Sequence, residues 1–285
     1  MAYKPNKKLS AEKQALHAEA KRRFDADRSK CFQRHLREVQ GEKANREKLK
    51  FDGTERIVRV PIEQARAVIE DHEWFGTTCP WTVASYALVL HGEILGALSL
   101  SKMGRDASNI CGEANADKIV HITRGACVDW APQGAASKLI RWSCMLAHAD
   151  KELRYSVFVA YSDSEAGEVG TVYQAAGFRY KGRDLGRSPD SFHVDFSPPI
   201  GTESEPVTSY KLNHDEKREL YRRLGWDETK GPPRLFLKRK GWTPEYVYGK
   251  GVYVLFVGSP EERAELEAAC KYPDKPYPRR NGEET

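Results

Sequence analysis

Two apolar segments separated by only two residues constrain the fold of this 285-residue chain most strongly. The segments WTVASYALVL (81–90) and EILGALSLSK (93–102) both alternate along their length, and His91 and Gly92 alone lie between them. A two-residue connection that contains glycine is typical of the tight turn of an antiparallel hairpin. The two segments are therefore predicted to form a β-hairpin.

Further elements flank the hairpin on both sides. An alternating segment at 57–61 predicts a strand, and the residues after it, 62–74, have the pattern of a helix. Downstream, residues 118–130 are predicted to form one long bent strand or a strand pair, and residues 131–150 an amphipathic helix. Residues 155–161 are predicted to form a buried strand, residues 171–177 a short helix and residues 178–182 a last strand.

After Gly182 the pattern loosens into a Ser- and Pro-rich excursion and a short charged helix. A final strand, GVYVLFVG, and a helix, SPEERAELEAAC, follow. We therefore expect three parts. Residues 1–52 form a basic helical or partly disordered arm, residues 53–183 form the core, and residues 184–285 form an irregular excursion and a C-terminal strand and helix that pack on the core.

The positive charge of the chain is concentrated at its N-terminus. Residues 1–50 hold 15 of the 46 Lys and Arg but only 7 of the 41 Asp and Glu, so the arm carries an excess of +8 and the rest of the chain −3. Such an arm can follow the phosphates of a nucleic acid by releasing counterions. The alternative is a solvated charged helix.

The cysteines and the hydropathy exclude several classes of protein. The six cysteines are scattered, without a CxxC pair or histidines at zinc-finger spacing, which argues against a disulfide framework and a structural zinc site. No apolar run has the roughly 18 to 20 residues that a membrane helix needs, and the first residues lack a signal-peptide core. We expect a cytoplasmic protein without a membrane partner.

The order of elements resembles the acyl-CoA-dependent N-acyltransferase (GNAT) plan, which implies an α/β (α+β) fold with a mixed, largely antiparallel sheet flanked by helices. In that plan loop amides at a helix N-terminus receive the pyrophosphate of the cofactor. The corresponding loop here supplies the predicted acetyl-CoA-binding residues, Gln133, Gly134, Ala135, Ala136 and Ser137. The alternative is a helix start built from small residues for packing.

The segment YSDSEAGEVGTVYQAAGFRYKG is more specific and resembles the signature of the phage Mom family of DNA adenine modification proteins. The matching residues are Tyr161, Ser162, Asp163, Gly167, Gly170, Tyr173, Gln174, Ala175, Phe178, Tyr180 and Gly182. Other landmarks of the family correspond to His72, Trp74, Gly76, Arg124, Ser137 and the closing KPYPRR. Where the family has a histidine, this chain has Glu168, and HITRG replaces the usual Glu-Leu-x-Arg.

The resemblance implies a GNAT-like transferase that modifies the exocyclic amine of adenine in phage DNA. It implies a carbamoylmethyl-type product, protection against host restriction enzymes, and acetyl-CoA and Fe(II) as cofactors. The catalytic candidates are Asp163, Arg124, His72, Ser137, Tyr173 and Glu168. Asp163 or Glu168 could accept the proton of the amine, and His72, Asp163 and Glu168 form a ligand set suited to Fe(II).

Double-stranded DNA is the implied macromolecular partner. An adenine inside a duplex has to be flipped out, and Trp74, Tyr86, Tyr161 and Tyr173 could form a stacking wall. A basic cluster consisting of Arg234, Lys238, Arg239 and Lys240 is a candidate DNA contact, with a solvated face as the alternative. The sequence leaves open whether the protein forms a homodimer.

Several of these residues have structural explanations as well. Asp163 could cap a turn, Arg124 could pair with a structural carboxylate, and His72 could be a surface or capping residue at a helix end. Two other functions compete with DNA modification. One is an ordinary GNAT N-acetyltransferase that acts on a small amine, a modified base or a protein, and the other is a catalytically silent DNA-binding protein on a GNAT-like scaffold.

Overall fold

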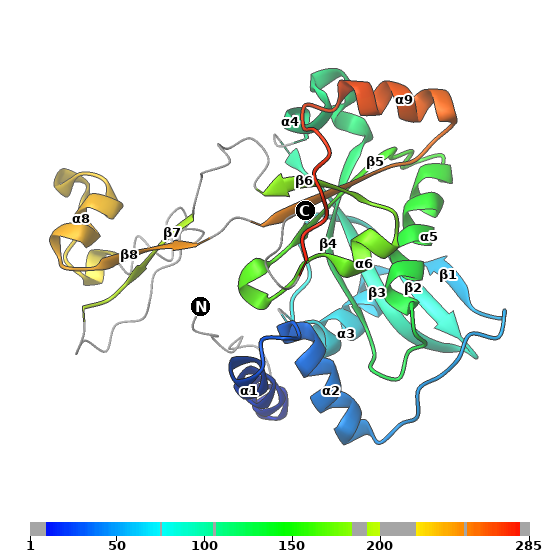
Figure 1. Ribbon diagram of the computed structural model, residues 1–285, viewed down its shortest axis with the longest axis horizontal. Helices are drawn as coiled ribbons and strands as arrows, with labels where there is room; N and C mark the ends of the chain where they lie inside the picture. Colours follow the sequence, from blue (N-terminus) through cyan, green and yellow to red (C-terminus); the bar gives the residue numbers. More distant parts are fainter. Residues whose placement is uncertain are drawn as a thin grey trace. The chain divides into compact units, whose positions relative to one another are not determined.

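The computed structural model (Figure 1) describes residues 10–74, 76–104, 107–183, 193–199, 221–247 and 250–279. The chain separates into two compact units. One comprises residues 187–249 with residues 1–2, and the other comprises residues 3–186 and 250–285. The division into an arm, a core and an extension stays a prediction.

The larger unit is built on a seven-stranded sheet with the order β1-β2-β3-β4-β5-β9-β6. The strands are β1 (Arg56–Arg59), β2 (Thr82–Leu90), β3 (Glu93–Lys102), β4 (Ile119–Cys127), β5 (Val157–Ser162), β6 (Arg179–Arg183) and β9 (Gly251–Phe256). All neighbours are antiparallel except β4 and β5. The predicted hairpin is β2–β3, and its turn residues His91 and Gly92 have φ values of 51° and 80°. Positive φ at both positions is what a type I′ turn requires.

The predicted C-terminal strand is β9, and it lies inside the sheet between β5 and β6. All six of its residues are buried, because helices cover both faces of the sheet at this point. Val252 and Val254 point to one core and Tyr253 and Leu255 to the other. The chain therefore returns from residue 250 to complete the sheet.

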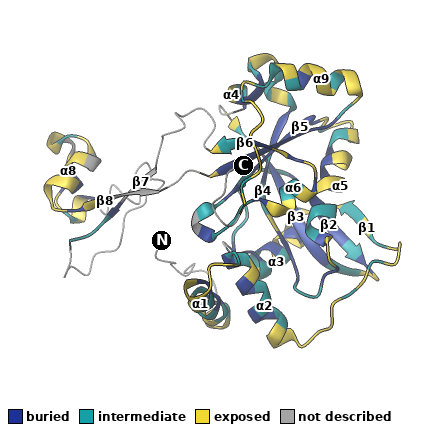
Figure 2. Ribbon diagram, viewed as in Figure 1, coloured by how far each residue is buried: buried dark blue, intermediate teal, exposed yellow. Residues whose placement is uncertain are grey.

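Helices cover the two faces of the sheet. One face carries α5 (Ala135–Ala149) and α6 (Thr171–Ala175), over the largest buried core. The other face carries α3 (Ile62–His72), α4 (Ser108–Cys111) and α9 (Pro260–Ala269), over two smaller cores. Figure 2 shows the buried strands between helices that are exposed on their outer sides. In the part of the chain that the structure describes, no helix combines the length and apolar character that crossing a membrane requires.

The N-terminal segment forms two packed helices, α1 (Ala11–Ala26) and α2 (Phe32–Ala44). Together they bury a cluster that also takes in a residue far along the chain; its members are Ala20, Phe24, Phe32, Leu36, Val39 and Ala166. This arm therefore packs against the segment that follows β5.

The smaller unit contains an antiparallel pair, β7 (His193–Ser197) and β8 (Thr243–Val247), and helix α8 (Pro233–Arg239). A separate aromatic core holds it together, formed by Phe196, Tyr221, Trp226, Phe236, Leu237 and Trp242. Most of the predicted charged helix around residues 214–226 lies outside the described residues.

Candidate active site

The candidate site begins where two neighbouring strands part. In the described sheet, β4 and β5 pair in parallel over three positions, of which His121 with Val159 is the last. Beyond this pair β4 continues to Cys127 beside β3, and β5 continues to Ser162 beside β9. The two strands are therefore not paired with each other at their C-terminal ends, where the chain enters two loops.

A β-bulge shapes the β4 side. Ser99 pairs with Arg124 and Leu100 with Ile122, so Thr123 is an additional residue in the strand. Thr123 Oγ1 lies 3.1 Å from Ser99 Oγ and 3.0 Å from Ser101 Oγ. Bulges redirect side chains and are frequent beside active sites. This bulge sets the direction of the arginine that follows it.

Arg124 faces a buried acid. Its Nε lies 3.9 Å from Glu73 Oε1, and its Nη1 donates to the carbonyl of Thr123 at 2.9 Å. Glu73 is buried and also accepts from the Gly76 amide at 3.1 Å. The expectation that Arg124 pairs with a carboxylate is thus met, and that carboxylate links β4 to the segment after α3.

The signature loop after β5 is closed by two acids. The carbonyl of Asp163 accepts from the amides of Ala166, at 3.1 Å, and Glu168, at 2.9 Å. In return the Asp163 amide donates to Glu168 Oε2 at 3.0 Å. The Asp163 carboxylate lies 3.8 Å from Lys250 Nζ. The main chain of Asp163, together with the carboxylate of Glu168, therefore forms the turn, and the Asp163 carboxylate points to a cation from the start of β9.

A close approach explains one glycine of the signature. Gly170 has φ 62°, and a Cβ atom there would lie 2.3 Å from Tyr253 Cζ. The Tyr253 hydroxyl donates to the carbonyl of Val169 at 2.7 Å, and Gln174 Nε2 donates to the same carbonyl at 2.8 Å. The loop is thus fixed on β9 and at the start of α6.

The electrostatics of the loop centre on Glu168. Burial raises its pKa to about 7; the Asp163 carboxylate contributes in the same direction, while the Asp163 amide, Lys250 and a hydrogen bond from the Trp74 side chain oppose the rise. The pKa of Tyr173 is raised well above its ordinary value by burial, and the charges of Glu168 and Glu73 add to this. Near neutral pH Glu168 can exchange a proton, and Tyr173 stays protonated.

Three side chains of this group were not among the predicted site residues: His121, Glu73 and Lys250. Burial lowers the pKa of His121 to about 3, so its imidazole is neutral, and its ring meets Tyr161 edge-on with centroids 4.9 Å apart. His121 precedes Arg124 on one strand, and Glu73 directly follows His72. This closeness to predicted site residues is the sequence signal that could have identified them. Lys250 is remote in sequence, and only the placement of β9 brings it here.

His72 lies at the end of α3 and does not join the two acids. Its Nδ1 is 3.3 Å from Gln40 Oε1, its ring meets Trp130 edge-on at 5.8 Å, and burial lowers its pKa. Among the residues that the structure describes, no three His, Cys, Asp or Glu side chains are grouped so that they could hold a metal. The predicted set of His72, Asp163 and Glu168 is therefore not brought together as an iron site.

The predicted cofactor loop directly precedes α5. Gly134 is left-handed, with φ 80°, and nothing lies within 4 Å of a Cβ built on it. Ser137 Oγ donates to the carbonyl of Gly134 at 3.0 Å, and Ala135 is buried in the main core. The amides that open a helix have no intrahelical acceptor. The loop thus fits a phosphate at Gly134, Ala136 and Ser137, whereas Ala135 is explained by packing.

The predicted aromatic wall loses one of its members, Tyr86, and its other members stay a prediction. Trp74 and Tyr161 are half-buried beside the site. Tyr86 is 1 % exposed in the core beneath α5, so its assignment to a stacking wall was wrong. Its position on an interior strand, covered by a helix, leaves no access to a base.

The basic cluster lies in the smaller unit, on α8 and on Lys240, which directly follows this helix. Lys238, Arg239 and Lys240 are exposed, whereas Phe236 and Leu237 turn inward to that unit's core. The side chain of Arg234 lies outside the described residues. The cluster is therefore exposed to solvent and available to a ligand.

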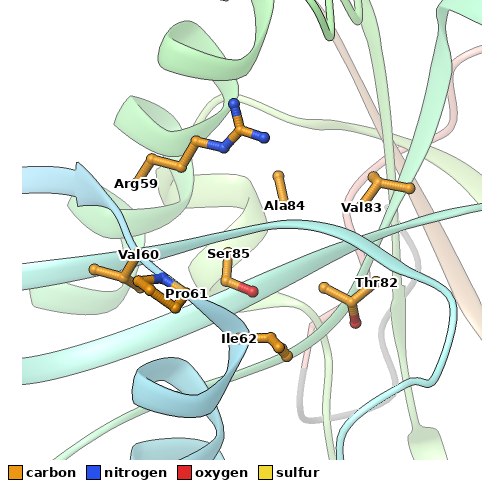
Figure 3. A pocket seen from close by; sticks show the side chains of 8 residues that line it. All are labelled: Arg59, Val60, Pro61, Ile62, Thr82, Val83, Ala84 and Ser85. Carbon is orange, nitrogen blue, oxygen red and sulfur yellow. The ribbon is translucent and has the colours of Figure 1, made fainter.

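A pocket of about 480 Å³ lies elsewhere, at the sheet edge where β1 ends and β2 continues (Figure 3). Its lining residues are Arg59, Val60, Pro61, Ile62, Thr82, Val83, Ala84 and Ser85. Ser85 Oγ is buried and has no hydrogen-bond partner among the described residues. None of the predicted site residues lines this pocket.

The sheet order, the parting of β4 from β5 and the loop that opens α5 define a GNAT-like fold, which confirms the predicted fold class. The chain belongs to the Mom protein family, whose model matches residues 55–220. This confirms the resemblance drawn from the signature segment.

Several solved acetyltransferase structures are similar to the chain. An IAA acetyltransferase from Bacillus cereus has 13% sequence identity, covers 72% of this chain and 100% of its own, and gives a TM-score of 0.37. A GNAT family acetyltransferase from Elizabethkingia anophelis with acetyl-CoA bound has 11% identity, with coverage of 72% and 100% and a TM-score of 0.36. The comparison with curated proteins gives no match.

Proposed function

We propose that the protein is a transferase that uses acyl-CoA and modifies the exocyclic amine of adenine in DNA. The observation that carries the proposal is the grouping of Glu168, Asp163, Tyr173 and Arg124 around the separated ends of β4 and β5, in a member of the Mom family. Attack of the amine on the thioester forms an N-acyl bond and releases the CoA thiol. The carbamoylmethyl-type group that the family resemblance implies is joined through an N–CH2 bond and contains an amide nitrogen, so acetyl-CoA alone does not supply it. The proposed benefit is protection of phage DNA from restriction.

The donor side is supported by the start of α5. An acyl-CoA supplies a thioester-activated group when it is bound. The open left-handed Gly134 and the amides of Ala136 and Ser137 would receive its pyrophosphate, because a helix N-terminus favours negative charge. The strand that precedes this loop is β4, which carries Arg124, and it stops pairing with β5 before the loop begins.

The acceptor side is supported by the two acids. The exocyclic amine of adenine is a poor nucleophile because its lone pair is delocalised, so a nearby base is needed as it reacts. Glu168 has a pKa of about 7 and can take this proton at neutral pH, with Asp163 and Lys250 beside it. Tyr173 keeps its proton and is available to a leaving thiolate. No step is assigned to iron, because the predicted ligands are not grouped.

Access to the site requires that adenine leaves the duplex. Tyr161, held edge-on by His121, offers a ring beside Asp163 for the extruded base. Arg124 and Lys250 are cations beside the same loop and suit the phosphates that flank the base.

Mass spectrometry of nucleosides tests the proposal. The protein is expressed in bacteria, co-resident plasmid DNA is digested, and deoxyadenosine is inspected for a mass shift, which also identifies the transferred group. The shift should appear with the wild type and with the exposed control Glu152→Gln, and should vanish with Asp163→Ala and Glu168→Gln. Unmodified DNA with turnover of acetyl-CoA on small amines would instead show an ordinary N-acetyltransferase. DNA binding without turnover would show a silent binding protein.

A further inference from the structure

The two N-terminal helices hold the segment that carries Trp74. Gln33 on α2 binds its main chain at two points: Nε2 donates to the carbonyl of His72 at 2.6 Å, and Oε1 accepts from the amide of Trp74 at 2.8 Å. Seven residues further along α2, on the same helix face, Gln40 Nε2 donates to the carbonyl of Asp71 at 2.5 Å. Helix α2 therefore fixes the end of α3 and the residues after it.

The same helices contact the signature loop. Phe32 meets the Trp74 ring edge-on with centroids 5.9 Å apart, and the Trp74 side chain donates to the carboxylate of Glu168. A Cβ on Gly167 would lie 3.1 Å from Phe24 Cε2, which shows how closely the loop approaches α1. Trp74 is thus held between the arm and Glu168.

The charges of the arm are largely occupied within it. Arg23 pairs with Glu19 and Glu42, both at 2.8 Å. Arg34 pairs with Glu38 at 2.9 Å, and Lys30 pairs with the same carboxylate at 3.0 Å. These pairs are compatible with an arm that serves the site by packing, in addition to any attraction to DNA.

We propose that helices α1 and α2 form one side of the candidate active site and that Gln33 is a positioning residue that acts on Glu168 through Trp74. The inference rests on the proposed function, because the state of Glu168 affects turnover only if this carboxylate takes the proton of the acceptor amine. Gln33 fixes the main chain of Trp74, Phe32 fixes its ring, and the indole N–H holds the carboxylate.

The pH dependence of DNA modification tests this link. The indole hydrogen bond favours the carboxylate form of Glu168, so its loss raises the pKa of Glu168. Trp74→Phe keeps a ring but loses the donor, and Gln33→Ala releases the donor while Phe24 and Phe32 still cover the loop. Both variants should move the acid limb of the activity to higher pH, by roughly half to one pH unit. Arg34→Ala, which changes an exposed neighbour on α2, should leave the limb in place.

A double variant shows whether the two residues act in series. If Gln33 acts through Trp74, then Gln33→Ala in the Trp74→Phe background should shift the acid limb no further than Trp74→Phe alone. Full additivity, or an unchanged profile in Gln33→Ala, would overturn the proposal. Circular dichroism and melting temperature of each variant establish that the fold is retained.

A second readout does not depend on activity. The carboxyl ¹³C shift of Glu168, assigned with Glu168→Gln, reports its titration in the free protein. If the wild-type protein does not modify DNA, the proposed function is wrong. A pKa of Glu168 that rises in Gln33→Ala would still support the link from Gln33 through Trp74 to Glu168. The same titration, unchanged in both Gln33→Ala and Trp74→Phe, would refute the link alone.

Discussion

The side-chain carboxyl group of Glu168 has a strongly raised pKa. Burial raises its pKa to about 7, while the Asp163 amide, Lys250 and the Trp74 side chain oppose the rise. A base works best when its pKa lies near the operating pH. The residue that replaces the family's histidine therefore titrates in the range where a histidine would.

Removing this carboxylate tests its role at the residue scale. Glu168→Gln keeps the shape but cannot take a proton, so DNA modification should fall by roughly 10²- to 10⁴-fold. In the wild type, activity should decline as the pH drops below about 7, because Glu168 then becomes protonated. Rates measured from pH 5 to 9 check both points. A wild-type rate that stays flat down to pH 5 would remove Glu168 as the base.

Gly170 tests the close approach to Tyr253. Gly170→Ala places a Cβ 2.3 Å from the Tyr253 ring and keeps a left-handed φ, so it combines a clash with backbone strain. Gly53→Ala is the control, since Gly53 is also left-handed, with φ 88°, but has nothing within 4 Å of the added atom. Chemical denaturation should show a loss of about 1–2 kcal/mol for Gly53→Ala and clearly more for Gly170→Ala. Equal losses would contradict the packing of this loop on β9.

At the scale of elements, the site depends on where neighbouring strands stop pairing. The parallel contact of β4 and β5 ends at His121 and Val159, and the bulge at Thr123 sets the direction of Arg124. The first turn of α5 then follows β4 through a loop that includes Gly134. Three local features, none of them unusual alone, thus shape the candidate site: the end of the β4–β5 pairing, the bulge at Thr123 and the loop before α5.

The loop before α5 can be tested with an isosteric pair. Asn and Asp both tolerate the left-handed conformation of Gly134, but only Asp adds a negative charge where a pyrophosphate would bind. Gly134→Asp should bind acetyl-CoA about tenfold more weakly than Gly134→Asn, and the difference should shrink at high salt. Calorimetric titration measures both affinities. Equal affinities at low salt would place the phosphates elsewhere.

At the scale of the whole molecule, two compact units carry different chemistry. The larger unit holds the candidate site, and the smaller unit presents an exposed basic segment on α8 above its own aromatic core. A cation that contacts DNA phosphate contributes mainly to non-specific, salt-dependent affinity. Mutations on α8 should therefore affect DNA binding without affecting the binding of acetyl-CoA.

Changing the exposed cations of α8 tests this separation. Replacing Lys238, Arg239 and Lys240 by alanine should weaken DNA binding for all sequences and reduce the slope of log affinity against log salt by up to about 3. Acetyl-CoA affinity should not change. The control replaces three exposed lysines of the larger unit, Lys50, Lys102 and Lys151. If the control weakens DNA binding equally, the effect reflects net charge and not the α8 surface.

The sequence alone predicted the features that depend on neighbours along the chain. The hairpin turn at His91 and Gly92, the helix after Gly134 and the signature from Tyr161 to Gly182 are all present near their predicted bounds. Turn conformation and amphipathic periodicity act over a few residues, so a local pattern contains them. The family resemblance rested on the same short segment.

Only the tertiary structure decided which distant segments meet. It inserted β9 between β5 and β6, brought Lys250 to Asp163, and packed the arm against Trp74 and Gly167. It also separated His72 from the two acids with which it was grouped as an iron site, and buried Tyr86 in the core. These contacts arise from burial of apolar surface, which is non-directional and carries no mark in the local sequence to show which segments will share one core.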